Sequence, residues 1–141
     1  MSRAIETDDE GLILLTNDGD FAQRVAHPSY ELEKTYVAEV EGRVATGTVK
    51  RLLAGVTLED GPVDVSAAKV VEARPQRSIV ELTIHEGRNR VVRRLLDEVG
   101  HPVRKLTRTA IGPVLLRGLR SGQLRELTRE ELGTLLDAAK L

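Results

Sequence analysis

A cluster of arginines follows a glycine in the second half of the chain. Within residues 86–95 the basic side chains are Arg88, Arg90, Arg93 and Arg94. Apolar residues recur at helical spacing over 89–99, so we expect these arginines near the start of a helix, with Arg90 on the same face as Arg93 and Arg94. Cations at a helix N-terminus oppose the helix dipole at a cost of roughly 0.3–1 kcal/mol each. The pattern therefore indicates that the guanidinium groups face negative charge.

Two kinds of negative partner fit these arginines. One is the phosphates of RNA, and the other is a carboxylate inside the protein, either buried or in a salt-bridge cluster with the acidic N-terminal region. The net charge is −1, but residues 1–20 carry six acids and one base, whereas residues 88–108 carry seven bases and two acids. A net charge near zero does not exclude a polyanionic partner, because binding depends on the local field. The residues alone leave both partners open.

A tyrosine is the second candidate, in a chain with only three aromatic residues. Tyr36 lies within residues 34–44, where apolar and polar residues alternate as in a strand. A strand tyrosine commonly fills a core. It can also form the platform on which a base taken out of its helix stacks. The spacing does not decide between the two roles.

Other catalytic chemistries lack a motif in this sequence. There is no cysteine, and the three histidines (His27, His85 and His101) do not have metal-ligand spacing with acids, so no metal site is predicted. No glycine-rich phosphate loop is present, and this disfavours the use of nucleoside triphosphates. No apolar run approaches the roughly 18 residues of a membrane span, and the N-terminus lacks a signal peptide. We therefore expect no membrane partner and a cytoplasmic location.

The strands and helices that position these residues can be predicted from the sequence. Together they indicate a mixed α+β fold in one domain of 141 residues. Strands are expected over 11–16, 34–44, 63–73, 78–85, 103–109 and 114–116. Helices are expected over 21–26, 46–54, 89–99 and, from a capping box that begins at Thr128, 128–139. The sum is a mainly antiparallel sheet with three or four helices.

Five groups of segments together resemble the RsuA/RluB-type ribosomal RNA pseudouridine synthases. They occur in the family's order over nearly the whole chain from Glu10 onward, and five motifs in order are far more specific than one. The segments are residues 10–19 (EGLILLTNDG), 27–30 with 33–37 (HPSY and EKTYV), 86–95 (EGRNRVVRRL), 106–113 (LTRTAIGP) and 119–128 (LRSGQLRELT).

The resemblance implies a pseudouridine synthase-like catalytic fold and the conversion of uridine to pseudouridine in ribosomal RNA, without a cofactor or metal. The target nucleotide would be flipped into a cleft, where a carboxylate acts on it while the base detaches, turns and rejoins through carbon. Tyr36 would stack on the target base, and Arg93 would pair with the catalytic carboxylate. Arg90 and Arg94 would hold RNA or shape the cleft.

The carboxylate follows from the family's motif. Counting back five residues from Gly11 puts Glu6 at the position of the family's aspartate, with one more methylene in its side chain. The expected set of RNA-binding residues is completed by Lys34, Arg88 and Arg108.

Residues 1–9 otherwise depart from the family's pattern. We therefore expect residues 1–9 to be replaced sequence and residues 10–141 to be a catalytic domain that is incomplete at its N-terminus. Missing strands would leave an exposed sheet edge, which pairs readily, so we expect a homodimer through that edge or through a swapped element. The alternatives to an enzyme are a non-catalytic RNA-binding remnant and an inactive folding fragment.

Overall fold

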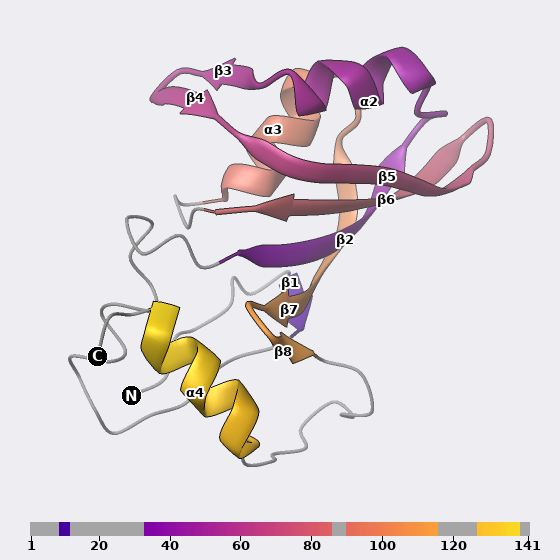
Figure 1. Cartoon of the computed structure of the whole chain (residues 1–141). Coiled ribbons are helices and arrows are strands. Elements are labelled where there is room, and N and C mark those ends of the chain that lie inside the picture. Colours follow the sequence, from indigo (N-terminus) through magenta and orange to yellow (C-terminus); the bar gives the residue numbers. More distant parts are fainter. Residues whose placement is uncertain (1–8, 12–32, 86–89, 116–126, 139–141) are drawn as a thin grey trace.

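Figure 1 shows the fold as a computed structural model, which describes residues 9–11, 33–85, 90–115 and 127–138. The strands are β1 (Asp9–Gly11), β2 (Lys34–Glu41), β3 (Val56–Leu58), β4 (Gly61–Val63), β5 (Val65–Ala73), β6 (Arg77–Ile84), β7 (Val103–Ile111) and β8 (Val114–Leu115). The helices are α2 (Thr46–Leu53), α3 (Val91–Glu98) and α4 (Arg129–Ala138).

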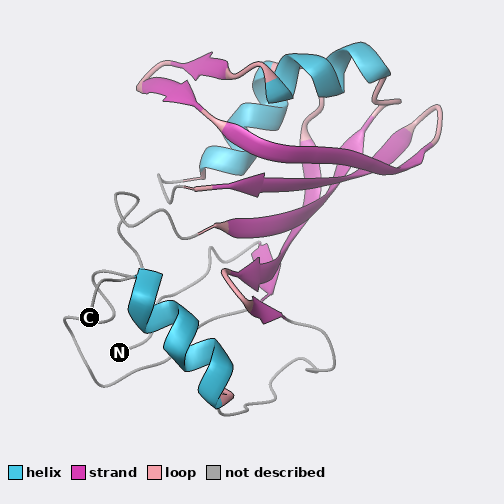
Figure 2. Cartoon of the chain, viewed as in Figure 1, coloured by secondary structure: helices cyan, strands magenta, loops and turns pink. Residues whose placement is uncertain are grey.

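One six-stranded sheet forms the centre of the molecule. Its strand order is β1-β7-β2-β6-β5, and β8 pairs with β7. The strand β1 runs parallel to β7, whereas the other described pairs of this sheet are antiparallel (Figure 2). The strands β3 and β4 form a separate antiparallel hairpin. The predicted α+β class with a mainly antiparallel sheet is confirmed.

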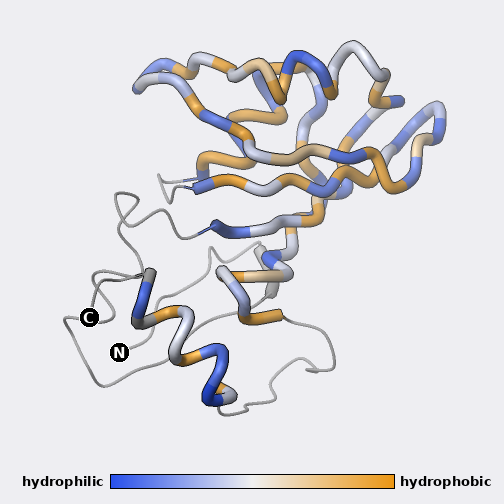
Figure 3. Tube along the Cα trace, viewed as in Figure 1, coloured by the Kyte–Doolittle hydropathy of each residue, from blue (hydrophilic) through white to orange (hydrophobic). Residues whose placement is uncertain are grey.

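The core lies on one face of this sheet because the strand residues alternate. Alternate side chains of β6 are buried, from Ser78 to Ile84, and those between them are only partly buried. The helices α2 and α3 lie on the same side of β5 and β6 (Figure 1). Their apolar residues join the strands in one cluster, to which α3 contributes Val91, Val92, Leu95 and Leu96 and α2 contributes Leu52. Hydrophobic stretches accordingly follow the strands and helices, whereas the β5–β6 connection is hydrophilic (Figure 3).

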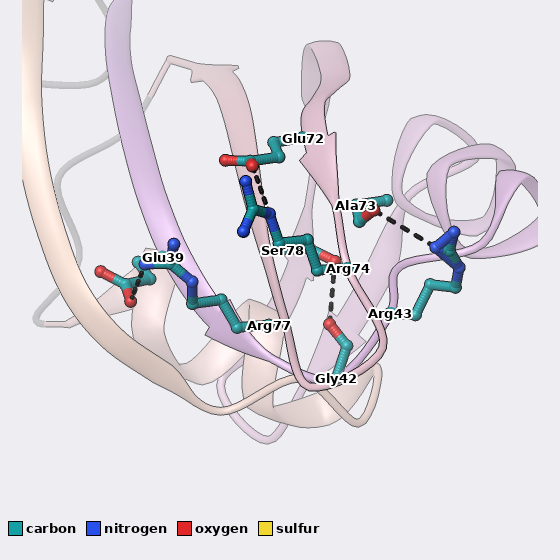
Figure 4. A network of polar contacts seen from close by, with 8 residues as sticks. All are labelled: Glu39, Gly42, Arg43, Glu72, Ala73, Arg74, Arg77 and Ser78. Atoms are coloured by element: carbon teal, nitrogen blue, oxygen red, sulfur yellow. Dashed lines mark hydrogen bonds and ion pairs between the residues drawn. The ribbon is translucent and has the colours of Figure 1, made fainter.

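A buried serine fixes the end of the sheet that lies farthest from Lys34. The Ser78 hydroxyl, which is fully buried, donates a hydrogen bond to the Gly42 carbonyl at 2.8 Å (Figure 4). It also accepts a hydrogen bond from the Val44 N–H at 3.0 Å. The connection between β2 and α2 is thereby attached to β6. Most buried polar groups need such partners, and this side chain satisfies two groups of a loop at once.

Most expected elements within the described residues are present. Helices α2, α3 and α4 confirm three of the four predicted helices, while the fourth, 21–26, lies outside the described residues. The capping box before α4 is formed as expected. The Thr128 N–H donates to a Glu131 carboxylate oxygen at 2.8 Å, and the Glu131 N–H donates to the Thr128 hydroxyl at 3.1 Å.

The structure departs from the expectation at the β3–β4 hairpin, at the first predicted strand and at the start of α3. The predicted strand 63–73 begins only at Val65, because Val63 belongs to the β3–β4 hairpin, which the sequence analysis missed. Of the predicted strand 11–16, Gly11 ends β1 and the remaining residues lie outside the described ranges. None of the described helices is long and apolar enough to cross a membrane.

Candidate functional site

Strand register brings two of the expected site residues together. Tyr36 in β2 lies directly opposite Arg108 in β7 and opposite Leu82 in β6. Gly11 of β1 is the partner of Arg108 on its other side. Both Tyr36 and Arg108 are partly buried, and the tyrosine packs against the core cluster. Directly opposed residues of paired strands share a face of the sheet, so the phenol and the guanidinium come from neighbouring positions on one face.

A buried cation belongs to the same face. Lys34 lies two residues before Tyr36, so its side chain leaves β2 on the same side. Its exposed fraction is 7%, and its strand partners are Ile84 and Ile111. A buried positive charge acts on neighbouring charges more strongly than it would in water.

The arginines of α3 occupy three different settings. Arg90 caps the helix with φ 53° and ψ 31°, a left-handed conformation that no other described non-glycine residue adopts. Arg93 is partly buried beside the apolar stripe that anchors α3. The Arg94 Nη1 lies 3.0 Å from the Oδ1 of Asp60 in the β3–β4 turn. One of the two partners weighed above, an internal carboxylate, is therefore present at Arg94, although it comes from the hairpin and not from the N-terminal region.

These residues converge on one end of the sheet. The strand β2 begins there with Lys34, and β6 ends there opposite it at Ile84. Helix α3 starts on the same side of the molecule (Figure 1). Glu6 and Arg88 lie outside the described residues, so the expected carboxylate and one expected RNA contact are not placed.

A polar group at this end was missed by the sequence analysis. The His85 Nε2, directly after β6, lies 3.2 Å from a Glu33 carboxylate oxygen, directly before β2. The Gly112 N–H donates to the Glu33 carbonyl at 2.6 Å. No short-range signal links these residues, because only the pairing of β2 with β6 and β7 brings them together. Across the described ranges, no group of three or more His, Asp and Glu side chains is arranged to hold a metal ion.

The family follows from comparison with known proteins. A sequence profile described as RNA pseudouridylate synthase matches residues 6–98. The chain belongs to this family. It is 52% identical over 128 residues to an uncharacterized RNA pseudouridine synthase of Mycobacterium leprae, covering 91% of this chain and 50% of that protein. It is 46% identical over 130 residues to the ribosomal large subunit pseudouridine synthase B of Bacillus subtilis, covering 91% of this chain and 53% of that protein.

Solved structures agree with the family's fold. A crystal structure of a pseudouridylate synthase matches with a TM-score of 0.79 and 34% identity, over 93% of this chain and 56% of the other. A chain of an H/ACA RNP bound to a substrate RNA matches with a TM-score of 0.58 and 18% identity, over 74% of this chain and 36% of the other, which is a likeness of fold. The chain spans about half the length of the curated relatives it matches.

Proposed function

We propose that this chain provides catalytic residues of an enzyme that isomerises uridine to pseudouridine in ribosomal RNA. The observation that carries the proposal is the placement of Tyr36 opposite Arg108, at the end of the sheet beside which the arginine helix α3 begins. Membership of the family and the name of the Bacillus subtilis relative support the reaction and the RNA class.

The reaction suits a site built from side chains alone. In an isomerisation the glycosidic N–C bond breaks, the base turns, and a C–C bond to the same sugar carbon forms. The ring carbon that forms this bond loses its proton, and the ring nitrogen that was released gains one. Nothing is oxidised or reduced, so the residues of the chain need only bind, orient and move charge. Tyr36 stacks on the flipped base, since base–aromatic stacking contributes about 1–3 kcal/mol and is available to any base.

Glu6 is proposed as the carboxylate and Arg93 as its partner. An arginine within a few ångströms favours the charged form of a carboxyl group and so lowers its pKa. Glu6 then stays ionised in a site from which the stacked base excludes water. The preference of a carboxylate for paired guanidinium donors also explains why a helix would carry arginines close to its positive dipole end.

The remaining cations hold the RNA. Lys34, Arg88 and Arg108 are proposed to face the phosphates or the target nucleotide, and Arg90 and Arg94 to hold RNA or shape the cleft. Each phosphate contact makes binding more sensitive to salt, because counterions are released. We propose residues 10–141 as catalytic domain and residues 1–9 as sequence that departs from the family's motif except at Glu6, although the family profile matches from residue 6. Because the proposed substrate is ribosomal RNA, we also propose that the enzyme is located in the cytoplasm.

We also infer that two copies of the chain can associate through a sheet edge. Strand β5 has a neighbour only on its β6 side among the described strands, and Val71 on it is 55% exposed. Edge strands offer a template for a second copy. Two register irregularities interrupt β5, and such bulges weaken edge pairing. Sedimentation at micromolar concentration tests this association, and a monomer there contradicts it.

The test of the enzymatic proposal uses ribosomal RNA from a strain that lacks the gene. The chain, and a form extended to the length of its relatives, are incubated with this RNA, and pseudouridine is mapped by position. We expect one new site, no product with Glu6→Gln, and a faster reaction with Glu6→Asp, because a misplacement of about 1 Å can cost ~10²-fold in rate. Binding without product from either form would select the non-catalytic RNA-binding alternative. The absence of both would select an inactive fragment.

A further inference from the structure

The β3–β4 hairpin packs against the arginine helix. Val56 and Leu58 of β3 and Val63 of β4 are buried in the core cluster to which α3 contributes its apolar stripe. The two residues between the strands are Glu59 and Asp60, so the turn carries two acids. One of them meets the helix, because the Arg94 Nη1 lies 3.0 Å from the Asp60 Oδ1.

The ion pair relieves a local conflict of charge. Arg90 and Arg94 stand four residues apart, and the Arg94 N–H donates to the Arg90 carbonyl at 3.0 Å in the first turn of the helix. Cations near a helix N-terminus oppose the helix dipole, and α3 has no acidic residue in its first turn. Asp60 supplies the missing negative charge from another element. The ion pair also attaches the polar face of α3 to the hairpin, while the buried apolar residues of α3 attach its other face to the core.

We propose that Arg94 is a positioning residue, which acts through Asp60 to hold α3 in the orientation that presents Arg93 to the reacting carboxylate. This inference rests on the proposed function. Of the two roles proposed for Arg94, holding RNA and shaping the cleft, it favours the second. Arg93 is the next residue along the helix, so a rotation of α3 that breaks the Arg94–Asp60 pair also turns Arg93. A phosphate ligand would be a poor use of Arg94, since Asp60 beside it repels RNA.

Exchanging the two charges tests the pair. The variants are Asp60→Arg, Arg94→Asp and the double exchange, and the first measurement is amide hydrogen exchange of α3 without RNA. An exposed ion pair changes a local opening equilibrium by up to about fivefold, so each single variant should speed exchange in α3 by two- to fivefold. The double exchange should restore the original rate, because the pair is re-formed with its charges reversed.

The second measurement is single-turnover pseudouridine formation, together with the salt dependence of RNA binding. Each single variant should slow the reaction, and the double exchange should restore it with an unchanged salt slope. If Arg94 contacts RNA, an aspartate at this position repels phosphate, so the double exchange stays slow and its salt slope falls. That result, or a lack of restored exchange, overturns the proposal. If the unsubstituted protein forms no pseudouridine, the proposed function fails, and exchange alone decides on the positioning role.

A matched ion pair elsewhere provides the control. Arg74 and Glu72 form an exposed pair at the opposite end of the sheet (Figure 4). Glu72→Arg and the double exchange of Glu72 and Arg74 carry the same changes of charge. Neither should alter exchange in α3 or the rate of pseudouridine formation.

Discussion

Two substitutions of Arg90 separate the free-energy cost of its left-handed backbone conformation from the contribution of its guanidinium group to RNA binding. Its φ of 53° lies in the left-handed region, which costs a residue with a Cβ roughly 1–2 kcal/mol. Glycine is not penalised there, but it loses about 0.4–1 kcal/mol through the greater freedom of its unfolded chain. Arg90→Gly should therefore be about 1 kcal/mol more stable than Arg90→Ala, which keeps the strain. The free energy of unfolding of Arg90→Ala should be close to that of the unsubstituted protein.

Urea unfolding and RNA titration measure the two effects separately. If Arg90 faces a phosphate, both variants should lower the slope of log K against log salt by roughly 0.7–0.9, the value of one contact. Arg74→Ala, which removes an exposed arginine at the far end of the sheet, should leave the slope unchanged. Equal stability of the two Arg90 variants would refute the left-handed assignment. An unchanged slope in both would refute the phosphate contact.

Substitutions at four further positions probe the fold and the proposed site. Ser78→Ala should destabilise the chain by about 1–3 kcal/mol in urea, because it removes both buried hydrogen bonds to the β2–α2 connection; an effect below that range would contradict their role. The hydrogen bond from Arg77 lowers the pKa of Glu39 in the folded protein. The Glu39 carboxylate therefore stabilises the folded state at pH values above its ordinary pKa of 4.5. This contribution is lost as the pH falls through the lower pKa of the folded state. Glu39→Gln should therefore lower the unfolding midpoint at pH 7 and leave it nearly unchanged at pH 2; an equal loss at both values would show that the charge plays no part. Leu95→Ala, in the fully buried stripe of α3, should cost about 2–5 kcal/mol by thermal or urea unfolding. Tyr36→Phe should retain RNA modification whereas Tyr36→Ala loses about 1–3 kcal/mol of base stacking, and equal rates for the two would argue for a tyrosine that only fills the core.

The hairpin that the sequence analysis missed shows where local patterns mislead. Val56 and Leu58 alternate with Thr57 as strand residues should, and a turn with an Asp60–Gly61 step follows. Pro62 obscured this signal, because proline within a strand normally argues against one. Here Pro62 is the exposed residue of the short second strand of a two-stranded hairpin, where a missing N–H is tolerated.

Helix α3 shows both sides of the comparison. Its apolar stripe and the glycine that follows it predict the helix and its end, because helical spacing and capping are local properties. The expected start at residue 89 was too early, since Arg90 takes a left-handed conformation and the helix begins at Val91. Nothing in the local sequence indicates that conformation, because arginine has no preference for it.

The amino acids alone determined the longer strands, the three described helices, the capping box and the motifs that resemble the family, since each depends on neighbours within a few residues. Only the tertiary structure decided that Tyr36 stands opposite Arg108 and that Arg94 meets Asp60, 34 residues away. Such pairings depend on strand order and register, which arise when distant elements bury their apolar faces together.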